Sequence, residues 1–143
     1  MLGTAGDMQI LENLALANRR GKPRGLAWGV TKEEKEQYRE LVKSLNLGLE
    51  DRLTTKMGLL SGGQRQAITL LMATLQKPKL LLLDEPTNAL DESGIKLVHK
   101  ILLEEKKRGA CIIIATHNKE DINVLCDKIL RVTDGCMEEI NVY

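Results

Sequence analysis

Two adjacent carboxylates, Asp84 and Glu85, follow directly on a run of four leucines at 80–83. An apolar run of this length is typical of a buried strand, so the pair stands where that strand ends. In phosphoryl transfer, an Asp at such a position holds Mg²⁺ through its water shell, and a second carboxylate polarises the attacking water. Taken alone, the pair fits an ordinary strand-to-loop transition equally well.

His117 stands at a similar place, because it follows the apolar segment CIIIAT at 111–116 and precedes Asn118, a suitable helix cap. A lone His at the end of a strand is usually a surface residue. Beside two carboxylates it becomes a candidate for hydrogen bonding to a terminal phosphate. His99, in the middle of a predicted helix, has no such company and is predicted to lie at the surface.

A third candidate is the glycine pair Gly62 and Gly63, which lies between Ser61 and Gln64 and directly before a helical pattern. Glycines let the backbone approach a ligand closely, and the free amides of a first helical turn attract anions. The segment LSGGQ therefore indicates a phosphate site. By itself the signal is weak, because two glycines before a helix more often form only a tight turn.

The first part of the chain, residues 1–58, reads as a small helical unit. Asp7 is predicted to cap a helix that Gly21 and Pro23 close, and a loop follows over residues 21–30. After this loop, Thr31 and Glu34 have the spacing of a capping box, which predicts the start of an amphipathic helix.

The second part, residues 59–143, reads as an α/β unit. Its predicted elements are a helix capped by Ser61 that Lys77-Pro78 ends, strand 80–84, helix 92–107, strand 111–116, helix 119–126 and a hairpin that turns at Asp134-Gly135. Strand, helix and strand with polar residues at the strand ends is a mostly parallel layout, whose ligands bind beyond the carboxyl ends of the strands. Both strands are predicted to be buried on both faces.

Composition excludes several classes of function. Lys and Arg number 21 against 20 Asp and Glu, and aromatic residues make up 2%, so neither an electrostatic field nor stacking platforms for nucleic acid are present. The three cysteines form no CxxC pair, which argues against a structural zinc site. No apolar run reaches the roughly 20 residues that span a bilayer, and the first ten residues lack a secretion signal. A cytoplasmic protein is expected.

In this order and at these spacings, LSGGQ, LLLLDEPTNALD and IIIATHN resemble the ATP-binding subunits of ABC transporters. Any one motif can arise by chance, whereas the three together are highly specific. The resemblance covers nearly the whole chain and implies an ABC-type P-loop NTPase fold. It also implies roles for individual positions: Ser61, Gly62, Gly63 and Gln64 as the signature that contacts ATP on an opposing subunit, Asp84 as the magnesium residue, Glu85 as the general base, Asn88 to Asp91 as the D-loop across the dimer, and His117 as the switch histidine.

The resemblance further implies ATP and Mg²⁺ as cofactors, a head-to-tail dimer with a second ATP-binding subunit, and a transmembrane permease that docks on residues 1–58. The subunit would lie at the inner face of the cell membrane, with no nucleic-acid partner. The chain departs from the family, because no G-x-x-x-x-G-K-[ST] phosphate-binding loop occurs, and the strand, aromatic adenine platform and glutamine loop that the family has before the helical part are also missing. We therefore expect a truncated chain that is inactive by itself.

Two alternatives stay open on the sequence. A non-transport ABC ATPase acting on DNA or ribosomes would usually carry long coiled coils or basic arms, and this chain has neither. A non-catalytic remnant that only binds a partner, or lends its signature in trans, agrees with the missing phosphate-binding loop. The segment up to LLLLDE looks like ATPases of amino-acid uptake, and the segment from PTNALD onward looks more like ATPases of peptide export. The direction of transport and the cargo are therefore not predicted.

Overall fold

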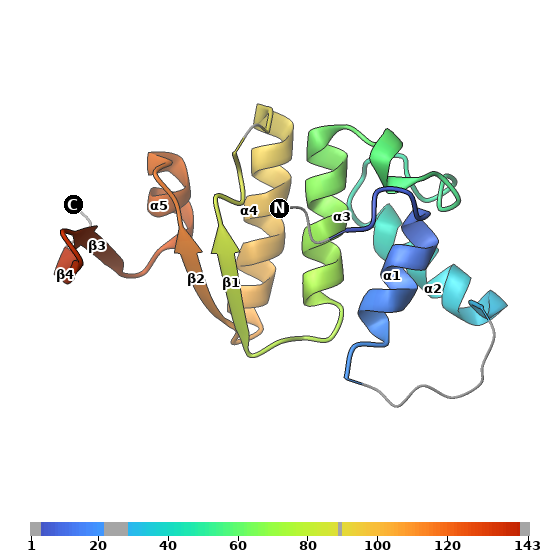
Figure 1. Ribbon diagram of the computed structural model, residues 1–143, viewed down its shortest axis with the longest axis horizontal. Helices are drawn as coiled ribbons and strands as arrows, with labels where there is room; N and C mark the ends of the chain where they lie inside the picture. Colours follow the sequence, from blue (N-terminus) through green and yellow to red (C-terminus); the bar gives the residue numbers. More distant parts are fainter. Residues whose placement is uncertain (1–3, 22–28, 89, 141–143) are drawn as a thin grey trace.

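The computed structural model describes residues 4–21, 29–88 and 90–140. The helices and strands, in chain order, are α1 (Ile10–Asn18), α2 (Lys32–Lys43), the 3₁₀ turn η1 (Met57–Leu59), α3 (Gly62–Thr74), β1 (Leu80–Asp84), α4 (Glu92–Lys107), β2 (Cys111–Ala115), α5 (Lys119–Leu125), β3 (Ile129–Thr133) and β4 (Cys136–Ile140). This order is the predicted one. Figure 1 shows α1 and α2 at one end, β1, β2 and α4 in the middle, and β3 and β4 at the other end. Pro23 and most of the predicted loop at 21–30 lie outside the described residues.

Helix α1 begins later than predicted, because its N-cap is Gln9 and not Asp7. The Glu12 carboxylate accepts the backbone N–H of Gln9 at 2.7 Å and so satisfies a donor that the helix start would leave unpaired. The backbone N–H of Ile10 donates to the Thr55 carbonyl at 3.0 Å. This bond to a distant segment adds to the local cap that Gln9 and Glu12 form at the start of α1.

Helix α2 confirms the predicted capping box. The backbone N–H of Glu34 donates to Thr31 Oγ1 at 3.1 Å, and the Thr31 N–H donates to Glu34 Oε2 at 2.9 Å. Tyr38 and Val42, four residues apart on one face of the helix, are fully buried. Burial of this face is the main contribution to the stability of α2, since short helices are only marginally stable on helix propensity alone.

Helix α3 lies between two hydrophobic cores. Ile68 and Leu71 pack into the first core with α1 and α2, whereas Leu70 packs into the second with α4 and α5. The helix therefore ties the helical part to the α/β part. The first core extends across residue 58 onto α3, so it does not mark a boundary there. The division of the chain at residue 58 stays a prediction.

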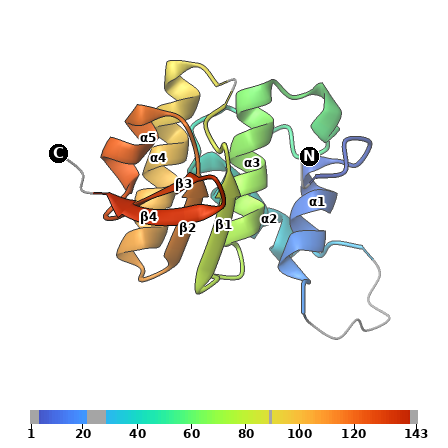
Figure 2. The ribbon, with the colours of Figure 1, turned by 60° about the vertical axis from the view of Figure 1, so that its left-hand side comes forward.

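Strands β1 and β2 pair in parallel, with Leu80 opposite Cys111 and Asp84 opposite Ala115. Both predicted strands are confirmed, and α4 connects them, as a parallel crossover requires. Helices α3, α4 and α5 cover one face of this pair through Leu83 and Ile112, among other side chains. Figure 2 shows the helices gathered on this side of the strands.

The prediction that both faces of these strands are buried is wrong. Exposure alternates along each strand, and the side chains of Leu80, Leu82 and Ile113 are 51%, 69% and 56% exposed. The reason is that the helices of the described residues lie on one side of the sheet only. Successive side chains of a strand point to opposite faces, so every second one faces away from the helices.

This open apolar face predicts self-association of the 143-residue chain. Replacing Leu82 by Lys should lower the association constant by about tenfold or more, since burial of one Leu side chain contributes about 1.5–3 kcal/mol. Sedimentation velocity over a range of concentrations measures it. Val124→Lys is the matched control, because Val124 is 42% exposed on α5. Equal association of both variants and the unmodified chain would contradict this prediction.

Strands β3 and β4 form the predicted hairpin. They pair antiparallel, with Thr133 opposite Cys136 at the turn end. Asp134 and Gly135 have φ of 50° and 79°, and positive φ at both central residues is what a tight two-residue hairpin turn needs. Figure 1 shows this hairpin standing apart from the β1–β2 pair. Within the described residues, no helix has the length and apolarity to cross a bilayer.

Candidate functional site

Glu85 and His117, both predicted as catalytic, lie in direct contact. The Nδ1 atom of His117 is 2.6 Å from Glu85 Oε1. The contact joins residues 32 positions apart, and the parallel register explains it, because Asp84 at the end of β1 pairs with Ala115 at the end of β2. Since a carboxylate only accepts, Nδ1 of His117 carries the proton when Glu85 is ionised. The Nε2 atom of the ring and Oε2 of Glu85 take no part in this contact.

Glu85 has an unusual backbone conformation. Its φ is 46°, in the left-handed region that costs a residue with a Cβ about 1 kcal/mol or more. The conformation is held by two hydrogen bonds: the Glu85 N–H donates to the Ala115 carbonyl at 2.8 Å, and its own carbonyl accepts from the Asn88 N–H at 3.2 Å. The strand pairing thus extends one residue past β1, and the chain then turns sharply with the Glu85 side chain beside His117.

Asp84, the predicted metal ligand, is exposed at the last position of β1. Among the described residues, no group of three or more His, Cys, Asp or Glu side chains gathers as a metal site. A single exposed carboxylate fits Mg²⁺ in a nucleotide site, because this ion is usually held by one or two carboxylates together with phosphate oxygens and water.

The predicted phosphate-binding residues at 61–64 form the start of α3. Ser61 is the N-cap, and its Oγ accepts the Gln64 N–H at 3.2 Å, while Gln64 Oε1 accepts the Ser61 N–H at 3.2 Å. The capping box therefore occupies two backbone donors of the first turn. Ser61 and Gly62 are exposed, and Gly63 is half-buried. The Ser61 hydroxyl proton and the Gly62 N–H are not needed by the capping box.

A hydrogen bond connects the start of α3 with the segment after β1. Gln66 Nε2 donates to the Pro86 carbonyl at 3.1 Å, one residue beyond Glu85. Gly63 lies close to the start of α4, where an added Cβ would be 3.9 Å from Leu90 Cδ2. The glycine segment and the carboxylate segment thus belong to one packed unit, although no hydrogen bond or ion pair joins residues 61–64 to Asp84 or Glu85 in the described part of the chain.

Asp91, predicted to contact nucleotide across a dimer, is the N-cap of α4. Its carboxylate accepts the Gly94 N–H at 2.9 Å and the Ser93 hydroxyl at 3.0 Å. The Gly94 hydrogen bond is the main reason why the pKa of Asp91 lies below its usual value. The side chain therefore serves the helix start in this structure. Ala89 of the predicted D-loop lies outside the described residues.

Residues 4–88 match the ABC transporter family. The chain belongs to this family. The match covers more than half of the 143 residues and ends just past the Asp84-Glu85-Pro86-Thr87 segment, so it includes the signature and both candidate carboxylates. Membership of this family implies nucleotide binding.

Two bacterial relatives illustrate the extent of similarity to ABC proteins. The uncharacterized ABC transporter ATP-binding protein YybJ of Bacillus subtilis (strain 168) is 51% identical over 92 residues, which are 64% of this chain and 42% of that protein. The tyrosine transport ATP-binding protein of Clostridioides difficile (strain R20291) is 35% identical over 138 residues, or 94% of this chain and 53% of that protein. The chain spans about half the length of these curated relatives.

A solved ABC structure shares the fold. The ATP-binding cassette MJ0796, determined as a dimer in a post-hydrolysis state bound to ADP and Pi, matches with a TM-score of 0.75 and 27% identity. The match covers 99% of this chain and 61% of that cassette. The predicted ABC-type P-loop NTPase fold class is therefore confirmed.

One correction concerns His99, which was predicted to lie at the surface of this ABC chain. It is 6% exposed, and its Nε2 atom is 2.6 Å from Oδ1 of the buried Asp121. The signal that could have found it is helical periodicity, because His99 stands four residues after Ile95 and three before Leu102. It therefore lies on the buried stripe of α4 with Val98 and Leu102.

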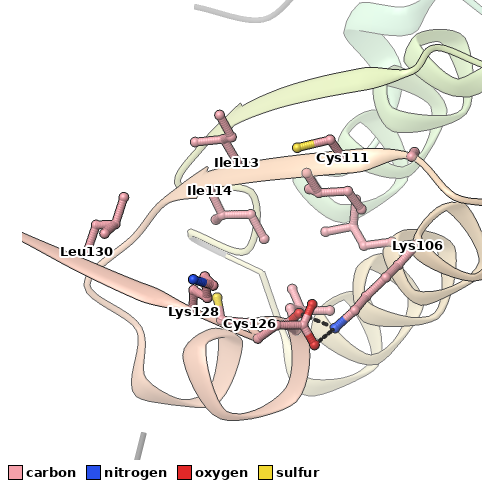
Figure 3. Close-up of a pocket in the computed structure, with 12 residues that line it drawn as sticks. Lys106, Cys111, Ile113, Ile114, Cys126, Lys128 and Leu130 are labelled. Atoms are coloured by element: carbon pink, nitrogen blue, oxygen red, sulfur yellow. Dashed lines mark hydrogen bonds and ion pairs between the residues drawn. The ribbon is translucent and has the colours of Figure 1, made fainter. Parts of the chain in front are cut away.

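A pocket of about 400 Å³ lies away from this candidate site. It is lined by β2, α4, the end of α5 and the start of β3, with Ile114, Cys126 and Leu130 on its walls. Figure 3 shows Lys106 reaching across to the end of α5, where Nζ donates to the Leu125 carbonyl at 3.1 Å and to Asp127 at 2.7 Å. Burial raises the pKa of the Cys126 thiol, which disfavours a reactive thiolate. We assign this apolar pocket no role in ATP chemistry.

Proposed function

We propose that this chain is the signature and switch part of an ABC ATPase subunit, which couples ATP binding and hydrolysis to solute transport across a membrane. The observation that carries the proposal is the 2.6 Å contact between His117 Nδ1 and Glu85 Oε1 at the carboxyl ends of two paired parallel strands. Ligands of parallel α/β sheets bind at this edge, so the pair stands where a nucleotide would lie.

Glu85 is proposed as the general base. One carboxylate oxygen is held by His117, and the other is free to accept a proton from water that attacks the terminal phosphate. The turn at Glu85 fixes the direction of its side chain. Asp84, one residue earlier at the strand end, would hold Mg²⁺, which supplies positive charge to nucleotide phosphates when bound.

His117 is proposed to orient Glu85 and to contact the terminal phosphate through Nε2. A phosphate oxygen is an acceptor, so the ring must donate from both nitrogens to make both contacts. The imidazolium form meets this condition. Its side chain is 82% exposed, which leaves the Nε2 side of the ring accessible to a ligand.

The start of α3 is proposed to serve a nucleotide held by a second subunit. The exposed Ser61 hydroxyl and the backbone of Gly62 and Gly63 offer hydrogen-bond donors at a helix N-terminus, which favours an anion. Gln64 is occupied in the capping box and would hold the shape of this segment. Asp91 would shape the neighbouring D-loop through its cap on α4.

The proposed partners are a second ATP-binding subunit and a transmembrane permease. The helical part, residues 1–58, is proposed as the docking surface for the permease, with the subunit at the cytoplasmic face of the cell membrane. The structural relative MJ0796 was determined as a dimer, which supports the first partner. The name of the tyrosine transport relative supports a role in transport.

A second candidate is a module without catalysis of its own, which lends its signature in trans. The 143 residues contain no G-x-x-x-x-G-K-[ST] segment, and this absence favours the second candidate for the chain taken alone. The Glu85–His117 contact favours the first, because a signature donor needs neither side chain.

A hybrid cassette decides between them. We define it as these 143 residues joined to the phosphate-binding loop region of an ATP-binding relative. The hybrid cassette is expected to bind ATP and release phosphate at about 1 s⁻¹ or faster, within the ordinary range of enzyme turnover. The 143-residue chain has no phosphate-binding loop, whose Lys side chain and backbone N–H groups would hold the phosphates. It should therefore show no micromolar ATP affinity in isothermal titration. A hybrid cassette that folds and binds ATP without hydrolysing it would contradict the first candidate and favour the second, a module that lends its signature in trans.

A further inference from the structure

Asp121 is a buried carboxylate that accepts hydrogen bonds from three separate segments of the chain. Its side chain has no exposed surface. Oδ1 lies 2.6 Å from His99 Nε2 on α4, while Oδ2 accepts from Thr87 Oγ1 at 2.6 Å and from Thr116 Oγ1 at 3.2 Å. Burial of a carboxylate is costly unless hydrogen bonds compensate, and these donors supply that compensation.

The direction of each hydrogen bond in this network is determined by Asp121. With the carboxylate ionised, Thr87 and Thr116 must donate to it, so each hydroxyl oxygen is left to accept. Both accept from one residue: Asn118 Nδ2 donates to Thr87 Oγ1 at 3.3 Å, and the Asn118 N–H donates to Thr116 Oγ1 at 3.1 Å. His99 correspondingly carries its proton on Nε2. A network in which every group has one assigned role rigidifies the segments it connects.

The connected segments are those that carry the two candidate catalytic residues. Thr87 stands two residues after Glu85, and Thr116 directly precedes His117. Asp121 therefore connects the chain after β1 and the chain after β2 through a single oxygen, Oδ2. The two segments are also joined by the Glu85 N–H bond to the Ala115 carbonyl and by the Asn118 Nδ2 bond to Thr87 Oγ1, and the carboxylate adds a buried connection to these.

The hydrogen bond with His99 connects Asp121 to a helix, whereas the bonds with the two threonines connect it to loops. It connects Asp121 to α4, the long helix that packs against β2 and α5, so the carboxylate is anchored to the core and not only to the two loops. His99 is 6% exposed and stands on the same buried stripe as Val98 and Leu102. A non-polar side chain at this position would pack in the core but leave Oδ1 of Asp121 without its donor.

We propose that Asp121 and His99 are positioning residues, which hold Glu85 and His117 at hydrogen-bonding distance through Thr87 and Thr116. The proposal rests on the proposed function in one respect, namely that the Glu85–His117 pair is the catalytic pair. Neither Asp121 nor His99 touches the nucleotide edge itself. Loss of the network is expected to separate the pair without unfolding the domain.

Nuclear magnetic resonance of the imidazole rings tests this in the 143-residue chain, because His99 and His117 are its only histidines. The ring nitrogen and Cε1–H signals of His117 are recorded at one fixed pH in the unmodified chain and in Asp121→Asn and Thr87→Val. Thr87→Ser is the conservative variant that keeps the hydroxyl. Glu120→Gln is the matched control, since Glu120 is exposed and adjacent to Asp121 on α5.

We expect the His117 signals to move, in both Asp121→Asn and Thr87→Val, toward those of a Glu85→Ala chain, in which the acceptor of His117 Nδ1 is absent. They should remain at the unmodified positions in Thr87→Ser and Glu120→Gln. Asp121→Asn keeps the shape of the side chain, and its backbone amide spectrum shows whether the fold persists. His117 signals that stay unchanged in folded Asp121→Asn, while those of His99 move, would overturn the proposal.

If Asp121→Asn does not fold, Thr87→Val and Thr87→Ser decide the outcome, because Thr87 lies outside the helices and strands. Unchanged His117 signals in Thr87→Val overturn the proposal, and a shift that Thr87→Ser abolishes supports it. No nucleotide is present in this measurement. An ATPase failure of the hybrid cassette therefore refutes the catalytic role of the pair, whereas an unchanged His117 spectrum refutes only the positioning role.

Discussion

Replacing Glu85 by Gln in the hybrid cassette is expected to lower the ATP turnover number by about 10²- to 10⁴-fold, the usual scale for loss of a general base. The amide has nearly the same shape as the carboxylate, and its Oε1 can still accept the proton that His117 Nδ1 offers at 2.6 Å. What disappears is the basicity of the second oxygen. The affinity for ATP should therefore change little, and the loss should fall on kcat.

Phosphate release at saturating ATP, together with the dissociation constant for ATP, separates these two effects. Glu104→Gln is the matched control, because it makes the same chemical change at an exposed position on α4. The backbone at Glu85 has a φ of 46°, which Gln tolerates no worse than Glu, so stability should be equal in both variants. Turnover by Glu85→Gln at the unmodified rate would mean that another group accepts the proton.

Ser61→Arg in the 143-residue chain should abolish its ability to activate a partner in trans. The partner is an ABC cassette with an intact phosphate-binding loop and an inactivated signature. In the proposed head-to-tail dimer, the start of α3 of this chain faces the terminal phosphate of the partner's nucleotide. Ser61 is exposed at this helix start, so an Arg side chain would occupy the space through which the terminal phosphate approaches.

The measured quantity is the ATPase rate of the partner with each variant added. Ser61→Ala is the matched control for the lost cap, because it removes the Gln64 N–H···Oγ hydrogen bond, worth about 1 kcal/mol, without adding bulk. Glu85→Gln in this chain should hardly affect activation, since the partner supplies its own base. Equal loss from Ser61→Arg and Glu85→Gln, or no activation by the unmodified chain, would refute the trans arrangement.

Local interactions explain why much of the fold could be predicted from the sequence. The capping boxes at Thr31 and Ser61 join residues three positions apart, so the residue types themselves indicate where α2 and α3 begin. The hairpin turn at Asp134-Gly135 is equally local. The cap of α1 was predicted wrongly because Asp is a common N-cap residue and Gln is not, although Gln9 and Glu12 also stand three positions apart. The bond of Ile10 to Thr55, a long-range contact, supports the observed start.

The sequence by itself determined the candidate residues at the strand ends. Glu85 and His117 each follow an apolar run, and a parallel crossover places the ends of both runs at one edge, so their contact was foreseeable from pattern and topology. The sequence also determined the ABC family, because three motifs stand in one order. These features depend on residue type and spacing along the chain.

Only the tertiary structure decided what surrounds these residues. Leu82 and Leu83 look alike in the sequence, yet Leu82 is exposed and Leu83 packs on the helices, because the side of the sheet that helices cover is a property of the whole arrangement. The His99–Asp121 and Thr87–Asp121 contacts span 22 and 34 residues. Their formation requires α4, α5 and the turn after β1 to pack together, so the free energy of that packing, and not any local preference, places a buried carboxylate behind the candidate catalytic pair.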